Sequence, residues 1–454
     1  MMHLLEQAHQ IIWGPYTLLI FLGVGIFFTI KCRFFQFLGF HYWWKHTAGT
    51  LFRGKKGYEK KGMTQFQSVC MALAATVGTG NIAGVATALT AGGPGAIFWM
   101  WISAFIGMMT AYSETMLGIQ YRLREKGGSY LCGPFVYMER GLGMKGMSLC
   151  YSFLCMMSSL SMGSMVQANS AVSTMSYTWG IPSVAGGLAF TGLLFLVAWG
   201  GIRRIGAVAE RLVPAASGIY LFFSMAVILS CMGKLPAVFG EMLSAAFRPE
   251  AAAGGIWGYA VSRSVRYGVS RGVFSNEAGL GTLAVLHGGA EDTTPQEQGM
   301  WAMFEVFFDT VILCTMTAVV ILCTWGLHPE KAPCTGAALA GWCFEKGLGA
   351  LGGHLISGSM AVFAFATVMA WFYLGRQAAS YFAGGLGIGD RGRDIFTSKI
   401  YPILYLAAVF VGSQLKLEAV WLLADLWNGM MAFPNLTALL FLARKVTLPK
   451  DYIE

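Results

Sequence analysis

Long runs of apolar residues alternate with short polar connections along the whole chain. Eleven of these runs are long enough to cross about 30 Å of hydrocarbon as helices. They predict transmembrane helices over residues 11–30, 64–88, 94–121, 148–177, 183–201, 207–233, 256–286, 299–325, 350–379, 397–413 and 418–443. Transmembrane barrels show short alternating strands instead. The pattern therefore predicts an all-α polytopic membrane protein.

The composition agrees with this prediction and excludes other classes. The residues AVILMFWYC make up 56% of the chain, and charged residues make up only 12%. An ordinary soluble domain carries about 25% charged residues. An aromatic content of 14% excludes a disordered chain. No phosphate-binding loop, serine-hydrolase elbow or zinc-protease helix appears, so we expect neither an enzyme nor an organic cofactor.

The positive charges predict an orientation in the membrane. The net charge is +9, and segment 31–63 alone carries eight Lys or Arg residues. If this basic connector is cytoplasmic, connections on its side hold 23 of the 31 Lys and Arg residues, and the opposite connections hold five. Positive charge in short loops marks the cytoplasmic side. We therefore expect an inner or plasma membrane protein with its N-terminus outside and its tail 444–454 in the cytoplasm. Cys334 and Cys343 would share one outside loop, which leaves a disulfide between them open.

Two predicted spans are rich in glycine and polar residues at mid-span. They contain Ala75–Gly84 (ATVGTGNIAG) and Tyr267–Gly279 (YGVSRGVFSNEAG). Both are poor continuous helices, and each is followed by four more spans. The chain therefore divides into two five-helix repeats, 64–233 and 256–443, which enter the membrane from opposite sides after an extra helix in 1–30. Interrupted helices at matching positions of inverted repeats point to a transporter site.

An interrupted helix exposes backbone groups of both polarities inside the membrane. Free N–H groups attract a carboxylate, and free carbonyls suit an ammonium or a hard cation such as Na⁺. We expect the breaks at Thr79–Asn81 and at Ser270–Asn276, where together they offer both poles that a zwitterionic amino acid needs. Gln167 and Asn169 lie in the middle of the fourth span. There a polar amide is either an interhelical bond or a ligand.

Charged residues inside the spans are either functional or paired with one another. The acids are Glu114, Glu277, Glu305, Asp309 and Asp425, and the bases are Arg263, Arg266 and Arg271. Arg271 and Glu277 flank the expected second break and are suited to holding it in place. Asp309 has three open roles: the partner of an Arg, a cation ligand or a proton acceptor. His287 and His354 lie near span ends, where we expect structural roles.

Blocks around the two breaks resemble the alanine/glycine:cation symporter family. The blocks are Thr76–Val85 (TVGTGNIAGV), Gly92–Trp101 (GGPGAIFWMW), Ser270–Gly281 (SRGVFSNEAGLG), Phe308-Asp309-Thr310 and Phe363–Trp371 (FAFATVMAW). The likeness extends over roughly residues 10–445. The resemblance implies a LeuT-type 5+5 inverted-repeat fold preceded by one extra helix. It also implies uptake of a small neutral amino acid, alanine or glycine, coupled to Na⁺.

The resemblance further implies where the amino acid binds. Its carboxylate would be held by Thr79, Gly80, Asn81 and Gln167. Its ammonium would bind backbone groups around Val273, Phe274 and Ser275, with Asn276 beside them. Phe274 and Trp371 would bound the side-chain pocket. A bulky indole leaves room for a methyl group or a hydrogen, which fits alanine or glycine.

The resemblance also implies a sodium site. Its ligands would be the carbonyls of Ala74, Val77 and Phe363 and the hydroxyl of Thr367. Asp309 is the candidate for a second cation site. At the sodium site the chain departs from the family pattern. We expect two adjacent hydroxyl residues at 366 and 367, and residue 366 is Ala, which removes one ligand.

Other functions stay open at this stage. A proton-coupled amino-acid transporter would use Asp309 or Glu114 as the proton carrier. A receptor of the same fold would bind an amino acid without transporting it. A channel would need a continuous polar pore, and no predicted span shows a regular polar stripe. The expected partners are a neutral amino acid, Na⁺ and the lipid bilayer, without nucleic acid.

Overall fold

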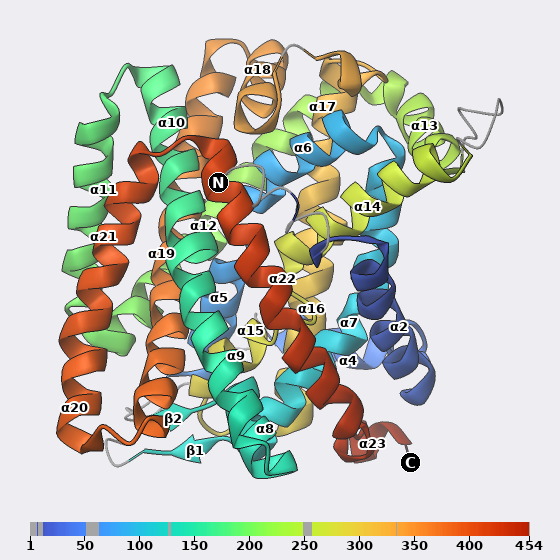
Figure 1. Ribbon diagram of the computed structural model, residues 1–454. Coiled ribbons are helices and arrows are strands. Elements are labelled where there is room, and N and C mark those ends of the chain that lie inside the picture. The colour runs from blue at the N-terminus through green and yellow to red at the C-terminus, as the bar shows by residue number, and fades with distance from the viewer. Residues whose placement is uncertain are drawn as a thin grey trace.

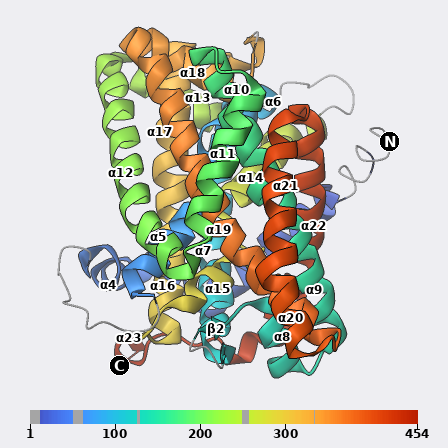
Figure 2. The same cartoon turned by 90° about the vertical axis from the view of Figure 1, so that its left-hand side faces the viewer.

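The computed structural model describes Gln7 and residues 12–50, 63–125, 129–247, 257–332 and 334–453. Its regular structure is helical except for one pair of two-residue strands. Most of the long helices lie side by side and run from one end of the molecule to the other (Figures 1 and 2). The predicted all-α membrane protein is therefore confirmed in its class.

The first half of the chain contains the strands and the first interrupted helix. In chain order its elements are α2 (Pro15–Lys31), α3 (Phe35–Leu38), α4 (Phe40–His46), η1 (Ala48–Thr50), α5 (Gln65–Thr76), η2 (Thr79–Asn81), α6 (Ala83–Gly92), α7 (Gly95–Tyr121), β1 (Leu123–Arg124), β2 (Tyr130–Leu131), α8 (Pro134–Leu142), α9 (Lys145–Ser158), η3 (Ser159–Val166), α10 (Gln167–Trp179), α11 (Ser183–Ala198) and α12 (Gly201–Ser230). The strands pair antiparallel, with Leu123 opposite Leu131.

The second half of the chain contains the second interrupted helix. Its elements are η4 (Met232–Lys234), α13 (Leu235–Phe247), α14 (Trp257–Asn276), α15 (Thr282–Leu286), η5 (His287–Gly289), α16 (Pro295–Val306), η6 (Phe307–Cys314), α17 (Thr315–Thr324), η7 (Pro329–Lys331), α18 (Gly336–Leu348), α19 (Ala350–Gly385), α20 (Gly389–Ile395), η8 (Phe396–Ile400), α21 (Tyr401–Gln414), α22 (Leu417–Phe441), η9 (Ala443–Lys445) and α23 (Lys450–Ile453).

Within the described residues, six helices are long and apolar enough to cross a membrane. They are Gly95–Tyr121, Lys145–Trp179, Arg204–Ser230, Pro295–Thr324, Ala350–Gly385 and Gly389–Gln414. The bent pair Gln65–Thr76 and Thr79–Gly92 brings the number to seven. The four other predicted segments contain α2, α11, α14 and α22, which are helical but do not meet the same criteria. The chain is thus a multi-span membrane protein. These criteria identify six or seven spans among the described residues and do not confirm the predicted number of eleven.

Local sequence explains where the central helices begin. The Thr64 hydroxyl accepts a hydrogen bond from the Gln67 N–H, and the Gln67 side chain accepts one from the Thr64 N–H, so a capping box starts α5. Thr294 and Glu297 form the same motif at the start of α16. Three stretches, η3, η6 and η8, are π-helices. Because π-helices often occur at functional sites, η3 and η6 draw attention to Gln167 and Asp309.

The two ends of the molecule differ. The strands, α8, α20 and α23 lie at one end, and α18 and α13 lie at the other (Figure 1). Residues 51–62 of the basic connector 31–63 lie outside the described residues. Cys334 and Cys343 are free cysteines, so the disulfide between them is not formed.

Candidate functional site

The first break comprises residues 77–82, between α5 and α6, and amide side chains hold its backbone. The helices on either side meet at 51°. Asn81 Oδ1 accepts a hydrogen bond from the Gly78 N–H (3.0 Å), and Gln167 Oε1 accepts one from the Thr79 N–H (3.2 Å). These bonds satisfy N–H groups that the interruption frees. The Thr79 hydroxyl is fully buried and has no hydrogen-bond partner within the described part of the chain.

Asn81 also joins the first break to the wide helix η6. Its Nδ2 donates to the Asp309 carboxylate at 2.5 Å and to the Asp309 backbone carbonyl at 3.2 Å. The same carboxylate accepts hydrogen bonds from the hydroxyls of Ser275 (2.7 Å) and Thr310 (3.0 Å). Asn276 donates to Thr310 in turn (3.0 Å). All five residues are buried. We call this set the polar junction, because both interrupted helices meet η6 there.

A glycine separates two groups that the sequence predicts as ligands. A Cβ on Gly78 would lie 2.7 Å from Thr367 Oγ1 and 3.1 Å from Gln167 Oε1. The Thr367 hydroxyl, on α19, donates toward the carbonyl of Ala74 (2.8 Å) and lies 3.0 Å from the carbonyl oxygen of Phe363. Three of the four predicted sodium ligands therefore lie together. Backbone carbonyls and a hydroxyl are oxygen donors of the kind that Na⁺ accepts.

The other two positions of the predicted sodium site lie beside these groups in the chain. Val77 is the first residue of the break and directly precedes Gly78. Ala366 is buried next to Thr367 and offers a methyl group instead of an oxygen. The cluster therefore lacks the second hydroxyl that the family resemblance led us to expect.

The second break comprises residues 277–281, between α14 and α15, and lies later than predicted. Because α14 is a continuous helix through Asn276, the prediction of a break over Ser270–Asn276 is wrong. The helix ends where the backbone becomes left-handed, at Glu277 (φ 59°), Gly279 (φ 91°) and Gly281 (φ 83°). Glycine tolerates this conformation, whereas a glutamate in it is strained.

The four predicted ligands of this region form the last turn of α14. They are Val273, Phe274, Ser275 and Asn276. The Val273 carbonyl accepts a hydrogen bond from the Glu277 N–H (2.9 Å), while the later carbonyls of the turn have no helical partner. A Cβ on Gly80 would lie 3.4 Å from Ser275 Cα and 3.5 Å from the Phe274 ring. The end of α14 therefore packs directly against the first break.

Two buried carboxylates hold the second break. Glu277 Oε1 accepts a hydrogen bond from the Trp371 indole N–H (3.1 Å). Glu114 Oε2, on α7, accepts bonds from the Gly281 N–H (3.1 Å) and from the Asn435 amide (2.9 Å). The other carboxylate oxygens of Glu277 and Glu114 have no partner among the described residues. Trp371, which we predicted to bound the substrate pocket, thus lies against the second break.

The charged groups of the spans pair less than expected. Arg271 forms an ion pair with Asp425 on α22 (2.8 Å) rather than with Glu277. Its guanidinium lies over the rings of Trp421 (5.0 Å) and Phe274 (5.4 Å). Arg263 instead donates to a backbone carbonyl of α6. The structural Arg–acid pairing predicted for the spans is therefore found at one acid of the five within the described part of the chain.

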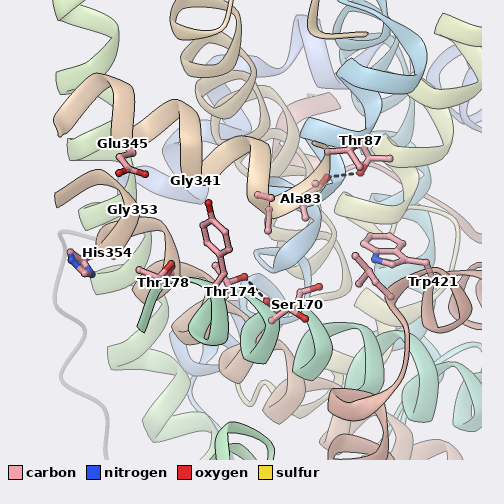
Figure 3. Close-up of a pocket in the computed structure, with 18 of the residues that line it drawn as sticks. Ala83, Thr87, Ser170, Thr174, Thr178, Gly341, Glu345, Gly353, His354 and Trp421 are labelled. Atoms are coloured by element: carbon pink, nitrogen blue, oxygen red, sulfur yellow. Dashed lines mark hydrogen bonds between the residues drawn. The ribbon is translucent and has the colours of Figure 1, made fainter. Parts of the chain in front are cut away.

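A cavity of 690 Å³ lies on one side of the first break. Hydroxyl groups of α10 form one wall, at Ser170, Ser173, Thr174 and Thr178. Glu345 and His354 lie toward one end of the cavity, and Trp421 lies toward the other, near Ala83 and Thr87 (Figure 3). The cavity therefore connects the region of α18 with the start of α6.

Aromatic rings separate this cavity from the first break. Trp421 lines the cavity and packs on Phe274, with ring centroids 4.7 Å apart. Phe274 in turn lies against Gly80. Arg271 also lines the cavity and is only 10% exposed. The stack of Trp421 on Phe274 therefore joins the wall of the cavity to Gly80 of the break.

Two features near the site carry no signal in the sequence. His287 is fully buried between Gln298 (2.5 Å) and Glu305 (3.1 Å). The structural role expected for it does not account for its contact with a buried carboxylate. These partners are 11 and 18 residues away in the chain, and no local motif joins them. His354, in contrast, accepts a hydrogen bond from the Trp179 indole (2.9 Å) at the rim of the cavity. The pattern of apolar residues does not predict the π-helices either.

Known proteins are similar in sequence to this chain along nearly its full length. The model of the sodium:alanine symporter family matches residues 1–454. The sodium/alanine symporter AgcS of Methanococcus maripaludis is 35% identical over 97% of this chain and 94% of its own. The probable sodium/glutamine symporter GlnT of Bacillus subtilis is 32% identical over 99% of this chain and 90% of its own. An uncharacterised transporter of Haemophilus influenzae is 37% identical over 99% and 96%.

Among solved structures, the crystal structure of MhsT in complex with L-phenylalanine aligns with 87% of this chain and 100% of its own. The sequence identity is 13% and the TM-score is 0.49, a level from which we draw no conclusion. The family resemblance found in the sequence blocks is confirmed by the match over the whole chain.

Proposed function

This chain belongs to the sodium:alanine symporter family, and from this premise we propose that it imports a small neutral amino acid, alanine or glycine, together with Na⁺. Proteins of this family are sodium-coupled amino-acid symporters rather than enzymes. Two relatives are named a sodium/alanine symporter and a probable sodium/glutamine symporter, so the family alone leaves the substrate open. The preference for alanine or glycine rests on the bulk of Trp371.

One observation carries the proposal: a single glycine separates the candidate cation site from the candidate carboxylate site. Thr367 Oγ1 and Gln167 Oε1 both lie within 3.1 Å of the place where a Gly78 Cβ would be. A carboxylate held by the Gln167 amide nitrogen, which shares its carbon with Oε1, and a cation beside Thr367 would therefore attract each other across Gly78. Symport requires that each ligand raises the affinity for the other by the same factor, and this proximity supplies the coupling.

The substrate groups fit the first break and the end of α14. The Thr79 hydroxyl is buried and free to donate to a carboxylate, together with the backbone of Gly80 and the amides of Asn81 and Gln167. The carbonyls of Phe274 and Ser275, with Val273 and Asn276 beside them, face no helical partner and suit an ammonium group. Trp371 would limit the size of the side chain.

Asp309 supports a second cation site at the polar junction. Its carboxylate is surrounded by Ser275 and Thr310 hydroxyls, which can rotate to present lone pairs to Na⁺. It has no cationic side-chain partner among the described residues. A proton would neutralise it equally well, and one relative is named a putative sodium/proton-dependent alanine carrier. Proton coupling at Asp309 is therefore the second candidate mechanism.

Transport would proceed by alternating access in a LeuT-type fold. We propose eleven spans, with repeats over 64–233 and 256–443 after the extra helix, the N-terminus outside and the 444–454 tail inside. In this orientation the 690 Å³ cavity opens to the outside. Phe274 and Trp421 would then close the outer side in this structure. The positive charge of the connections supports this orientation.

Uptake of labelled alanine and glycine into proteoliposomes tests the proposal. Accumulation driven by an inward Na⁺ gradient, and lost when choline replaces Na⁺, is the expected result. Accumulation driven only by a proton gradient would refute sodium coupling and favour Asp309 as a proton carrier. Saturable binding without accumulation under either gradient would favour a receptor.

A further inference from the structure

A buried histidine of η5 lies beside a buried carboxylate of α16. His287 and Glu305 are both fully buried, and His287 Nε2 lies 3.1 Å from Glu305 Oε2. On its other side, His287 Nδ1 lies 2.5 Å from Gln298 Oε1. Glu305 Oε1 has no hydrogen-bond partner among the described residues. Neither side chain has a role in the site described above.

A chain of hydrogen bonds from the surface fixes which nitrogen of His287 carries a hydrogen. The Thr293 hydroxyl has two acceptor-only neighbours, the Glu297 carboxylate (3.2 Å) and the Thr294 carbonyl (3.4 Å). It accepts a hydrogen bond from the Gln298 amide nitrogen at 3.0 Å. This orients the Gln298 amide oxygen toward His287, so Nδ1 must be the donor.

This orientation has a consequence for Glu305. With Nδ1 protonated, a neutral His287 presents a lone pair at Nε2, and that lone pair faces a carboxyl oxygen. Two acceptors at 3.1 Å repel each other unless a proton lies between them. The proton belongs either to an imidazolium or to a carboxylic acid. In both cases the pair binds one proton more than a neutral histidine and a carboxylate bind when they are apart.

The surroundings favour retention of that proton. Two other buried carboxylates, Glu277 at the second break and Asp309 four residues further along, act on Glu305 as like charges. Arg122 donates to the backbone carbonyls of Gly288 and Ala290 rather than to Glu305.

Residues 282–290, which comprise α15, η5 and Ala290, depend on this pair for one of their contacts. The same residues are held by Ser68 of α5, which donates to the Leu286 carbonyl (3.0 Å), and by Cys132, which donates to the Ala284 carbonyl (3.0 Å). Met63, just before α5, bridges to Ala290. Loss of the shared proton would leave a charged Glu305 buried against a lone pair, which is unfavourable in an apolar interior.

We propose that His287 and Glu305 form a proton-binding site, and that its proton holds residues 282–290 closed against α5 and α16. The folded, closed arrangement binds this proton more tightly than an open one does. Closure is therefore favoured at low pH and is lost as the pH rises. The site goes beyond sodium symport, and only its transport readout rests on the proposed function.

Alkylation of the native Cys132 reports whether residues 282–290 are closed. Gly288 packs so closely on Cys132 that an added Cβ would overlap it. The segment therefore covers the thiol, and its movement makes the thiol accessible. The purified protein in lipid nanodiscs is exposed to a brief pulse of a neutral maleimide between about pH 6 and pH 9, and labelling of the Cys132 peptide is measured by mass spectrometry. Glu305→Gln keeps a donor toward His287 Nε2 without a titrating proton. Dividing wild-type labelling by that of Glu305→Gln removes the pH dependence of the thiol itself.

The expected ratio rises more than about threefold across this range, because one group titrates between the closed and open states. Glu297→Gln, at the exposed end of the hydrogen-bond chain, is the matched control and should follow the wild type. A ratio that stays flat would overturn the proposal. If Glu305→Gln does not fold, His287→Gln serves as the reference, since its amide cannot take up the proton. Sodium-driven uptake should fall at high internal pH in the wild type only. An absence of uptake at every pH would instead refute the proposed function and leave the labelling test intact.

Discussion

The two breaks interrupt their helices in different ways. At the first break, neutral amides hold the backbone through Asn81 and Gln167, and Gly78 keeps a negative φ of −135°. At the second break, the carboxylates of Glu114 and Glu277 hold it, and three of its five residues have positive φ. One break thus depends on exchangeable neutral hydrogen bonds, and the other depends on a fixed backbone shape.

This difference suggests a division of labour. A neutral amide or hydroxyl can exchange a backbone partner for a ligand at little cost, because both states are hydrogen-bonded. A chain turned by left-handed residues keeps its geometry whether or not a ligand is present. We interpret the first break as the ligand-binding element and the second as a rigid support on which Trp371 rests. Substitutions in the two breaks test whether these two roles are separate.

The largest effect is expected from Asn81→Ala. This change removes the bond to the Gly78 N–H and the bond to Asp309, so it disrupts the first break and the polar junction together. Each lost buried hydrogen bond costs about 1–3 kcal/mol. Uptake per folded transporter should fall to about one-hundredth of the wild-type rate, which corresponds to the loss of about 3 kcal/mol. The measurement is the initial rate of sodium-driven uptake, normalised to the monodisperse protein recovered from the liposomes.

Asn169→Ala is the matched control for this experiment. Asn169 is also a buried amide, but it donates to the carbonyls of Gly412 (2.8 Å) and Leu415 (2.7 Å) on and beside α21. It should lower thermal stability and leave the uptake rate of the folded fraction unchanged. Equal losses of uptake in both variants would show that any buried amide matters, and would remove the special role of the first break.

The largest effect on stability, rather than on uptake, is expected from Gly281→Ala at the second break. Residue 281 has φ 83°, and a Cβ there would overlap the Pro134 ring and lie 2.7 Å from the Tyr151 hydroxyl. Left-handed strain costs about 1–2 kcal/mol and overpacking about 1–3 kcal/mol, so the loss of stability should be about 2–5 kcal/mol. Gly84→Ala is the control, because a Cβ there meets nothing within 4 Å. Thermal unfolding of the two purified variants in detergent is the measurement, and similar melting temperatures would contradict a rigid second break.

The sequence predicted the first break well and the second one poorly, for a physical reason. Around Gly78 and Asn81, glycine and amide residues coincide with the real interruption. In α14 the glycines serve packing instead. A Cβ on Gly268 would overlap the Ala96 carbonyl, and one on Gly272 would overlap Ser103, so these residues allow α7 to approach closely. Helix propensity alone does not distinguish a glycine that breaks a helix from one that packs it.

Other features depend on tertiary neighbours and could not be predicted. The left-handed φ of Glu277 is set by the bonds at the ends of the second break, and no residue type signals it. The π-helices before Gln167 and around Asp309 follow no apolar period. The polar contact of His287 depends on Glu305, which lies on another helix. The class of protein, the residues of the first break and the cluster around Thr367 needed no such information.

A smaller effect is expected at the cation cluster next to the first break. Thr367→Ala removes the hydroxyl that lies between the carbonyls of Ala74 and Phe363. The Na⁺ concentration for half-maximal uptake should rise about tenfold, equivalent to about 1.4 kcal/mol, while uptake at saturating Na⁺ changes less. Ala366→Ser adds the hydroxyl that the family leads us to expect and should lower that concentration. A sodium titration of both variants decides the matter, since an unchanged curve in Thr367→Ala would remove the cluster from the sodium site.

The smallest effect is expected from Glu277→Gln, and it tests the comparison most directly. The amide oxygen of Gln can still accept the hydrogen bond from Trp371, so the support of the indole is kept and only the charge is lost. Uptake and sodium dependence should change less than about threefold, or 0.7 kcal/mol, because the hydrogen bond from Trp371 is kept. Asp309→Asn removes the same charge at the polar junction and should weaken sodium dependence far more. Sodium titrations of the two variants, measured side by side, give the answer. If Glu277→Gln impairs uptake as severely as Asp309→Asn, the carboxylates of the second break take part in ligand binding, and the two breaks share one role.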